Sequence, residues 1–457
     1  MRLYNTLSRQ IEEIAPITPP EITLYTCGPT VYDYPHIGNW FTFIRYDLLV
    51  RTLKSSGYEP KWVMNITDVG HLSSDADEGE DKLASRAKKE GKNAWEVAAF
   101  YSDYFNTALC RLNFTTPWQL PKATEHIDEQ INFIKSLEQK GYTYQISDGV
   151  YYDTAKFPAY ADFARLDLDE QQAGARVGIN PQKRNPTDFA LWKLSPEGSK
   201  RDMEWDSPWG RGFPGWHIEC SAMCLKFLGE TVDIHAGGID HVPIHHTNEI
   251  AQSQALTGQP LANIWMHTNH ILINDEKISK SLGNSITLED VEKHGFSLEA
   301  FRLHVLESSY RSQSKFNWDS LGAAASRLLR YKNLAVLRFQ LNGKENVVLN
   351  GLREAMQDDL NTPLALAKLE EFIGKVENSD TSRQSIENAV TEIDSLFGLK
   401  LAETSDITDE QKDLIRQREQ ARSAKDFTRA DNIRNRLTEA NIGLNDMPSG
   451  PIWSYLN

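Results

Sequence analysis

The chain has 457 residues, more than one hydrophobic core usually organises, so we expect two to four domains. Apolar residues make up 40% of the sequence and charged residues 25%, which is ordinary for a globular protein. The net charge of -15 argues against a protein that coats polyanions in general, although a local basic face could still bind nucleic acid.

Four cysteines in so long a chain are typical of a reducing compartment and argue against a disulfide framework. Residues 1–15 lack the apolar segment of a secretory signal and contain Glu12 and Glu13. No apolar run approaches the roughly 18 residues that a membrane-spanning helix needs. We therefore expect a soluble, cytoplasmic protein with no membrane segment. A monomer is expected, although the sequence does not determine the oligomeric state.

The first third of the chain follows the pattern strand, helix, strand. Residues 21–26 are strand-like, and residues 36–56 carry apolar side chains at helical spacing before a stop at Gly57. Residues 61–66 form the next strand-like run. A helix of about 20 residues between two strands is a βαβ unit, which predicts a parallel sheet.

A later strand-like run, residues 231–235, leads into Gly237 and Gly238. Between the two halves lies a long segment with a helical stretch at residues 125–141 and short strand-like pieces. We therefore predict an α/β fold, in which a Rossmann-like parallel sheet is split by an α+β insertion. The functional site should lie at the carboxyl ends of the strands.

The chain turns helical from about Asp319, which predicts a C-terminal helical bundle followed by a small terminal domain. Asn361 and Pro363 mark a helix start, and Thr408 with Gln411 forms a capping box. One apolar stripe is expected in the last helix, formed by Phe427, Ala430, Ile433 and Leu437. The same region is rich in arginine, with Arg416, Arg418, Arg422, Arg429, Arg434 and Arg436.

Four potential zinc ligands lie in three separate segments. They are Cys27 after the first strand, Cys220, and the pair His245 and Glu249, whose spacing places them on one helix face. Two sulfurs, an imidazole and a carboxylate suit a tetrahedral Zn2+ with an open position. Other nearby residues could serve instead, namely Cys224, His217, His235 and His246.

Two further segments have the composition of phosphate-binding motifs. Pro35-His36-Ile37-Gly38-Asn39 enters the first helix, where backbone N–H groups and the helix dipole favour an anion. Lys277-Ile278-Ser279-Lys280-Ser281 places two lysines three residues apart near a glycine. Each segment alone could equally be an ordinary loop or a solvated lysine loop.

Together, these two segments resemble the HIGH and KMSKS signatures of class I aminoacyl-tRNA synthetases. Four longer segments make the resemblance specific to the cysteinyl-tRNA synthetase family: TCGPTVYDYPHIGN, GWHIECSAM, PIHHTNEIAQS and DDLNTPLAL. The resemblance runs from Tyr4 to about Trp453, essentially the full length of the chain.

The resemblance implies one zinc ion per chain, held by Cys27, Cys220, His245 and Glu249, and ATP as co-substrate with Mg2+. It implies that the catalytic residues are His36, Asn39, Lys277 and Lys280. The implied ATP-binding residues are His36, Gly38, Asn39, Gly238, Asp240 and Lys280, and the implied residues of the cysteine pocket are Trp216, His235 and Asp240.

By the same resemblance, the enzyme would join L-cysteine to the α-phosphate of ATP and then transfer it to the 3'-terminal adenosine of tRNA(Cys). Zinc would bind the substrate thiolate and so select cysteine over serine without an editing domain. The expected domains are 1–113 and 207–256 (catalytic sheet), 114–206 (insertion), 257–318 (stem-contact region with the KISKS loop), 319–402 (helical bundle) and 403–457 (anticodon-binding domain). Arginines with Trp453 and Tyr455 would stack on anticodon bases.

The sequence departs from the family pattern at several positions. Asn39 replaces the last histidine of HIGH, which puts the strength of phosphate stabilisation in question. Ile278 replaces methionine, a change that conserves volume. Two other functions remain open: a ligase that joins cysteine to an amino sugar, and a tRNA-binding scaffold with a structural zinc. The arginine-rich tail argues against the first, and Lys277, Lys280 and His36 argue against the second.

Overall fold

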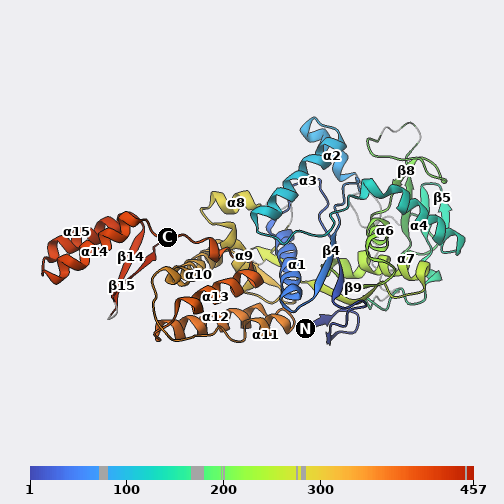
Figure 1. The fold of residues 1–457 in the computed structure, drawn as a ribbon. Coiled ribbons are helices and arrows are strands. Elements are labelled where there is room, and N and C mark those ends of the chain that lie inside the picture. Colours follow the sequence, from blue (N-terminus) through green and yellow to red (C-terminus); the bar gives the residue numbers. More distant parts are fainter. Residues whose placement is uncertain are drawn as a thin grey trace. The chain divides into compact units, whose positions relative to one another are not determined.

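The computed structural model describes residues 1–71, 81–165, 180–196, 198, 201–273, 276–278, 285–447 and 450–456 (Figure 1). The chain forms two compact units. Unit 1 contains residues 1–288, 310–315 and 357–360, and unit 2 contains residues 289–309, 316–356 and 361–457. The six expected domains divide the chain more finely than these units, so their boundaries stay predictions.

Unit 1 is built on a four-stranded parallel sheet with the strand order β10-β9-β3-β4. The strands are β3 (Glu21–Thr26), β4 (Glu59–Met64), β9 (Val232–Gly238) and β10 (Ala262–Thr268). Successive side chains of β3, such as Leu24 and Tyr25, are both fully buried, so both faces of the sheet are covered. The predicted α/β class with a parallel sheet is confirmed.

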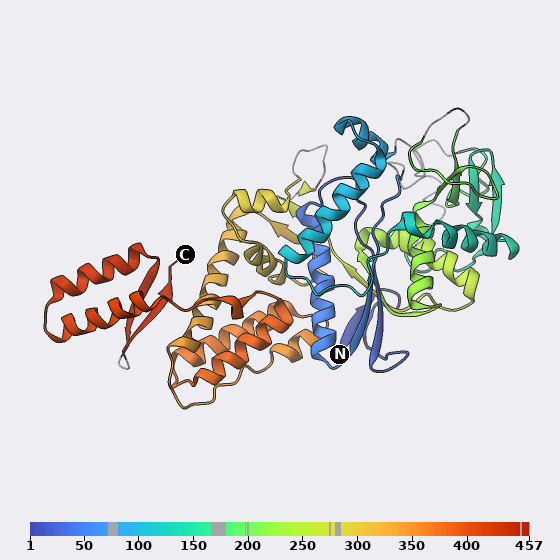
Figure 2. The same ribbon diagram turned by 45° about the horizontal axis from the view of Figure 1, so that its top comes forward.

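Three helices connect these strands. Helix α1 (Ile37–Ser55) leads from β3 to β4, as the βαβ pattern predicted, and lies along the sheet (Figures 1 and 2). Helix α6 (Trp216–Leu228) precedes β9, and α7 (Thr247–Thr257) follows it. Because all four strands run the same way, the loops after β3, β4, β9 and β10 meet at one edge of the sheet.

The chain between β4 and β9 is a mixture of helices and antiparallel strands, as expected. Its helices are α2 (Lys82–Glu90), α3 (Ala94–Arg111) and α4 (Ile127–Gln139), and its strands are β5 (Thr143–Ile146), β6 (Gly149–Tyr152), β7 (Phe189–Leu194) and β8 (Gly212–Pro214). These strands form one antiparallel sheet in chain order. Helix α4 packs against α6 and α7 (Figure 1), so the insertion and the parallel sheet share one hydrophobic core.

The N-terminus forms a hairpin against the outer strand of the parallel sheet. It consists of β1 (Arg2–Asn5) and β2 (Gln10–Glu13), and β1 packs beside β10. The Asn5 side-chain amide donates to the carbonyl of Asn263 at 2.9 Å, which ties the hairpin to the edge. Beyond β10, the short strands are β11 (Ile271–Ile273), β12 (Glu276–Lys277) and β13 (Ser314–Phe316).

Unit 2 is mainly helical, as predicted from residue 319 onward. Its helices include α8 (Leu288–Lys293), α9 (Leu298–Leu306), α10 (Trp318–Val336), α11 (Leu352–Gln357), α12 (Thr362–Glu377) and α13 (Arg383–Phe397). The Asn361 side chain caps α12, with Pro363 in its first turn, which confirms that predicted helix start. Among the described residues, no helix is long and apolar enough to cross a membrane.

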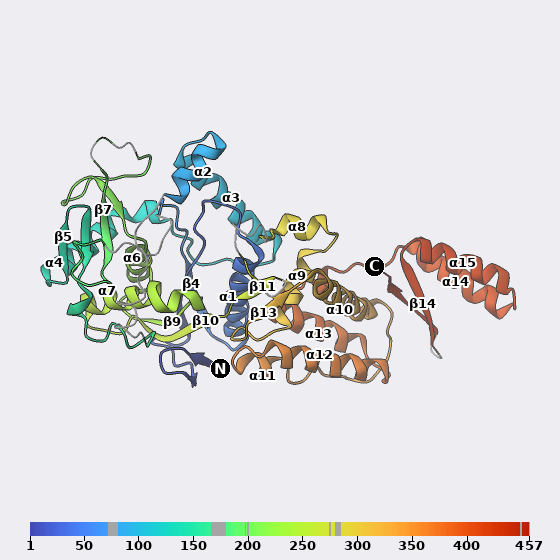
Figure 3. The same ribbon diagram turned by 180° about the vertical axis from the view of Figure 1, so that it is seen from behind.

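The end of unit 2 combines two helices and a hairpin. Helices α14 (Asp409–Ser423) and α15 (Phe427–Glu439) lie side by side, and β14 (Ile442–Met447) pairs with β15 (Gly450–Tyr455) (Figure 3). The predicted capping box of Thr408 and Gln411 opens α14.

Two aromatic side chains of this region differ from expectation. Trp453 is buried in a cluster with Val336 and Ile433, so the expectation that it stacks on RNA bases is wrong. Phe427, expected inside the apolar stripe of α15, is 62% exposed, because it lies in the first turn and only Ala430, Ile433 and Leu437 reach the core.

Candidate active site and metal centre

A cavity of about 430 Å3 lies at the carboxyl edge of the parallel sheet. Its walls come from the segments after β3, β4 and β9 and from the first turns of α1 and α6. Of the expected site residues, the cavity is lined by Cys27, His36, Asn39, Trp216, Cys220, Gly238, Asp240 and His245. The fold therefore gathers residues from widely separated segments of the sequence around one space.

Three of the four expected metal ligands, Cys27, Cys220 and His245, line one wall of this cavity. The ligand atoms of Cys27, Cys220, His245 and Glu249 all lie within 4.8 Å of one another, and all four residues are buried. We call them the four-donor cluster.

Each ligand of the cluster is positioned by a regular element or its end. Cys27 follows β3 directly, and its N–H donates to the Ala236 carbonyl of β9 at 3.0 Å. Cys220 lies in α6. His245 belongs to a single π-helical turn, Val242–His246, that leads into α7, and its Nε2 lies 2.9 Å from Glu249 Oε1. Such π turns are frequent at functional sites.

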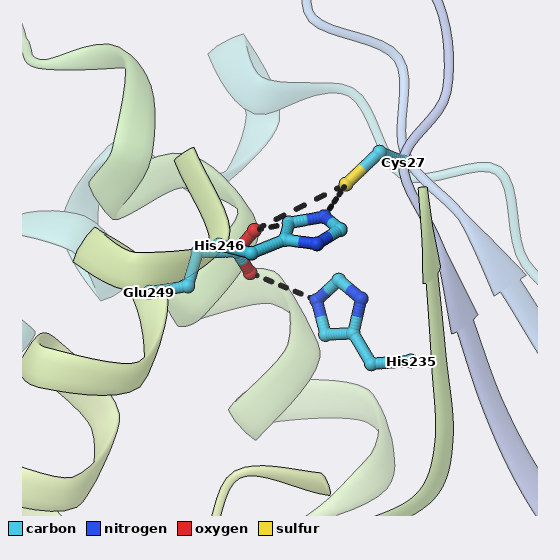
Figure 4. A group of neighbouring side chains, drawn as sticks. All are labelled: Cys27, His235, His246 and Glu249. Carbon is cyan, nitrogen blue, oxygen red and sulfur yellow. Dashed lines mark hydrogen bonds and ion pairs between the residues drawn. The ribbon is translucent and has the colours of Figure 1, made fainter. Parts of the chain in front are cut away.

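A second set of donors lies behind the first and shares two of its members. Figure 4 shows Cys27, His235, His246 and Glu249, whose ligand atoms also lie within 4.8 Å of one another. Nε2 of His246 is 3.3 Å from Cys27 Sγ, and Nε2 of His235 is 3.0 Å from Glu249 Oε2. His235 and His246 were alternates in the sequence, and the distances alone would admit either set.

The position of the cavity separates the two sets. Cys27, Cys220 and His245 line it, whereas His235 and His246 are fully buried and do not. Three members of the four-donor cluster therefore face a molecule in the cavity, whereas only Cys27 of the second set does. The four-donor cluster also contains both thiols, and two soft sulfur ligands favour zinc over hard cations such as Mg2+.

The charges of the four-donor cluster suit a bound cation. Burial raises the pKa of Glu249, but His235 and His245 outweigh it and hold this pKa at about 2. Burial lowers the pKa of His245, but Glu249 and Cys220 raise it to about 10. A hydrogen bond with Cys27 lowers the pKa of Cys220 to about 7. Burial raises the pKa of Cys27 well above its usual value, so the charged pair of the metal-free cluster is Glu249 and His245. A divalent cation bound there would replace the protons of the thiols and of His245.

His36 and Asn39 form a reciprocal cap at the start of α1. The Asn39 N–H donates to His36 Nδ1 at 3.3 Å, and the His36 N–H donates to Asn39 Oδ1 at 3.1 Å. A neutral His36 ring therefore carries its proton on Nε2, the nitrogen that can donate to an anion. Asn39 thus satisfies the helix end while its side-chain NH2 group remains a donor.

Gly38 is explained by the same turn. A Cβ atom on Gly38 would lie 2.9 Å from the His36 ring and 2.9 Å from Cδ1 of Ile278. Only glycine lets the first turn of α1 approach both groups so closely. Gly38 therefore shapes the turn rather than lining the cavity.

The two signature segments meet in space. Besides the approach of Ile278 to Gly38, the Ile37 N–H donates to the Ile286 carbonyl at 2.8 Å. Lys277 lies in β12, paired with Leu272 of β11. Lys280 lies outside the described residues, so its expected role stays a prediction.

The expected cysteine-pocket residues divide into two groups. Trp216 and Asp240 line the cavity, and the Trp216 ring lies 4.5 Å from the His245 ring, centroid to centroid. His235 does not line it, because the ring lies behind the four-donor cluster, stacked 4.5 Å from Trp265 and hydrogen-bonded to Glu249. The position of His235 in the middle of a buried strand was the sequence signal that it would not line the pocket.

Sequence reasoning missed one pair beside the cluster. Nε2 of His71 lies 2.8 Å from Glu219 Oε1, and His71 lines the cavity. Glu219 is fully buried, and burial raises its pKa well above the usual value. Since 148 residues separate the two, no local pattern could have paired them.

The chain matches two family models. Residues 13–326 match the class I (C) catalytic domain of tRNA synthetases, and residues 352–401 match the DALR domain. Two solved structures share the fold at 13% identity. The methionyl-tRNA synthetase of Mycobacterium tuberculosis with methionyl-adenylate has a TM-score of 0.60, with 84% of this chain and 93% of that chain covered. A leucyl-tRNA synthetase ternary complex from Agrobacterium radiobacter has a TM-score of 0.61, with 86% of each chain covered.

Curated relatives match over the whole length. The cysteine–tRNA ligase of Treponema denticola is 41% identical over 493 residues, with 100% of both chains covered. Cysteine–tRNA ligase 1 of Burkholderia lata is 43% identical over 457 residues, with 98% of this chain and 96% of the relative covered. The chain therefore belongs to the cysteine–tRNA ligase family of class I aminoacyl-tRNA synthetases.

Proposed function

We propose that this protein is a cysteine–tRNA ligase, which activates L-cysteine with ATP and transfers it to the 3'-terminal adenosine of tRNA(Cys). The observation that carries the proposal is the shared cavity. It places two thiols and an imidazole on one wall and the capped first turn of α1, with His36 and Asn39, on another. A small thiol and a nucleotide would thus meet in one cavity.

In the first step, a carboxylate oxygen of cysteine attacks the α-phosphorus of ATP, and the bond to the β-phosphate breaks to release pyrophosphate. Little covalent chemistry falls to the protein, so positioning and charge neutralisation dominate. We assign His36 Nε2–H and the Asn39 amide as donors to phosphate oxygens. Lys277 and Lys280, together with Mg2+, would neutralise the polyphosphate.

In the second step, a ribose hydroxyl of the terminal adenosine attacks the cysteinyl carbonyl, and the phosphate oxygen leaves as AMP. Asp240 and Gly238 lie on the cavity wall at the end of β9, where they suit the ribose or the amino group of the substrate. Trp216 provides an apolar wall beside His245.

Cysteine is selected at the four-donor cluster. We assign Cys27, Cys220, His245 and Glu249 as the residues that hold one zinc ion, since their chemistry and burial fit it. Bound there, zinc supplies a soft cation that accepts a thiolate and discriminates against the hydroxyl of serine. The residues themselves fix the positions of the donors, and their two sulfurs disfavour hard cations such as Mg2+.

The end of unit 2 would bind the tRNA anticodon. Phe427 is a large exposed aromatic side chain on α15, and Arg429 is exposed on the same helix. Aromatic and arginine side chains suit unpaired bases and their phosphates. The six domain boundaries, a cytoplasmic location and a monomeric state belong to this proposal.

Cysteine-dependent exchange of pyrophosphate into ATP tests the first step, with zinc-stripped and zinc-loaded protein compared. Transfer of labelled cysteine to tRNA(Cys) or to an amino sugar then tests the acceptor. We expect exchange to require zinc and transfer to require tRNA. Absence of exchange in zinc-loaded protein would contradict the proposal, and transfer to the amino sugar alone would favour the small-acceptor ligase.

A further inference from the structure

A line of hydrogen-bonded side chains runs from the four-donor cluster, away from the cavity, to the N-terminal hairpin. Cys27 Sγ lies 3.3 Å from His246 Nε2, and His246 Nδ1 lies 2.7 Å from His267 Nε2. His267 Nδ1 lies 2.8 Å from Thr6 Oγ1. We call these three residues, Thr6, His267 and His246, the relay.

The relay occupies a tightly packed position. His246 is fully buried and His267 is 5% exposed. A Cβ atom on Gly237 would lie 2.3 Å from Cε1 of His246, so the glycine in β9 makes room for this ring. The His246 ring also packs 5.0 Å from the Trp265 ring. The rings are therefore held in one orientation, which is the condition for a defined hydrogen-bond direction.

The direction follows from the chemistry of the two ends. A metal-bound Cys27 sulfur is a thiolate and can only accept, and His246 Nε2 also faces Glu249 Oε1 at 3.9 Å, another acceptor. Nε2 of His246 must then donate. In a neutral ring Nδ1 accepts, so His267 Nε2 donates to it, and His267 Nδ1 accepts from the Thr6 hydroxyl.

We propose that Thr6, acting through His267, orients His246 so that its Nε2–H donates to the Cys27 sulfur, and that this hydrogen bond tunes the metal site. The inference rests on the proposed function only in taking the four-donor cluster as a zinc site. All three are positioning residues, since none touches the substrate cavity. Their role differs from that of His235, which holds the other side of the cluster through Glu249.

The hydrogen bond should favour the metal-loaded cluster. A bond donated to an anionic sulfur is stronger than one exchanged with a neutral thiol, and a chain of such bonds strengthens each member. It also withdraws charge from the sulfur and leaves the cation a better acceptor for a second thiolate. Losing outer partners of metal ligands typically weakens metal binding by roughly 10- to 100-fold.

The test measures metal binding by the full chain with metal alone, without cysteine, ATP or tRNA. Zinc affinity comes from competition with a chromophoric chelator, and the Cys27 sulfur is followed by the sulfur-to-cobalt absorption band of the Co2+ form. His246→Leu should weaken zinc binding by roughly 10- to 100-fold and shift the band to lower energy. Thr6→Val should weaken binding by roughly 3- to 10-fold with a smaller shift in the same direction.

Two comparisons separate the relay from general structural damage. Thr6→Ser keeps the hydroxyl, and we expect wild-type affinity and band position. In the His246→Leu background, Thr6→Val should cause no further loss, because its effect passes through His246. Wild-type behaviour of Thr6→Val, or additive losses in the double variant, would overturn the inference.

Pyrophosphate exchange by the wild-type protein distinguishes a failure of the relay from a failure of the proposed function. Normal zinc-dependent exchange together with an unaffected Thr6→Val variant would refute the relay alone. Absent exchange in a protein whose relay variants show the expected metal affinities would refute the proposed function alone. If His246→Leu does not fold, the Thr6→Val and Thr6→Ser pair still decides the question through affinity and band position.

Discussion

At residue 220, sulfur and oxygen differ little in size but greatly as ligands. Cys220→Ser replaces a soft thiolate, so we expect zinc affinity to fall by more than about 100-fold, beyond the loss typical of outer partners. Cys224→Ser is the matched control, since Cys224 lies one turn further along α6, is equally buried and is not a member of either donor set. Equal zinc content in both variants, measured by elemental analysis, would rule out Cys220 as a ligand.

At residue 39, one side chain performs two tasks that substitution can separate. Asn39→Asp keeps the oxygen that caps His36 but loses the amide donor and adds negative charge near the phosphates. We expect normal thermal stability and adenylate formation slowed by on the order of 10²-fold in single-turnover assays. Asn39→Ala should also lose about 1 kcal/mol of stability, the usual value of a cap. Adenylate formation at wild-type speed in Asn39→Asp would remove Asn39 from phosphate binding.

The metal ligands show how far individual site residues could be predicted from the sequence. Composition and spacing singled out Cys27, Cys220 and the pair His245 and Glu249, and the structure brings these four together. The spacing of the histidines could not show which of them is the metal ligand, because the choice between His245 and His246 depends on which ring faces the cavity. That orientation is set by a π-helical turn and by the space at Gly237, neither of which has a sequence signature.

At the scale of elements, the strands and helices of the sheet were predictable because their apolar spacing is regular. The strand at residues 21–26 and the helix start at Asn361 agree with the structure. The surface of the terminal helices was less predictable, since arginine occurs both in ion pairs and on binding faces. Arg418 is buried and donates twice to Asp446, at 2.7 and 2.8 Å, so it cannot be free to bind RNA.

The pairing of Asp446 with α14 predicts a pH dependence. The hydrogen bonds from Arg418, together with that from Arg422, outweigh the opposing effect of burial and hold the pKa of Asp446 well below its usual 3.8. A carboxyl whose folded pKa is depressed stabilises the fold above its unfolded pKa and loses this contribution as the pH falls further. The thermal unfolding temperature of the wild type should therefore fall more steeply as the pH drops below about 4 than the unfolding temperature of Asp446→Asn.

The control for this pH dependence is Asp413→Asn. Asp413 pairs with Arg416 on the exposed surface of α14, where solvent screens the interaction. The unfolding temperature of Asp413→Asn should therefore depend on pH in nearly the same way as that of the wild type. Parallel profiles for the wild type and Asp446→Asn between pH 5 and pH 2 would show that the Asp446 pair contributes nothing to the stability of the hairpin.

At the scale of the whole molecule, both chemical steps of the proposed reaction belong to unit 1, and the proposed binding of the tRNA anticodon belongs to unit 2. All described residues of the cavity belong to unit 1, and α14, α15 and the terminal hairpin belong to unit 2. The parallel sheet and its split by an insertion were predictable from the run of strands and helices, whereas the strand order was not predicted. The burial of Trp453 was not, because its partner Val336 lies more than 100 residues earlier in the chain.

This division predicts that tRNA charging and cysteine activation respond to different changes. Phe427→Ala removes an exposed ring from α15 without touching the core, so pyrophosphate exchange should remain within about twofold of the wild type. Loss of the stacking contact between Phe427 and one base should cost roughly 1–3 kcal/mol of tRNA binding, or about 5- to 150-fold in kcat/KM for tRNA. Arg429→Glu should weaken tRNA binding and flatten its dependence on salt, since fewer counterions are released.

Truncation before Thr408 extends the same test to the whole terminal region. It should spare cysteine-dependent pyrophosphate exchange, because every described cavity residue lies upstream, and it should strongly impair cysteine transfer to tRNA. The cut also uncovers Val336, so the matched comparison is Phe427→Ala, which leaves that contact intact. Trp118→Ala, a substitution at an exposed aromatic residue of unit 1, serves as the control for surface rings in general. Unchanged tRNA charging by both the truncated chain and Phe427→Ala would mean that the acceptor is not held by its anticodon, and would favour a small acceptor.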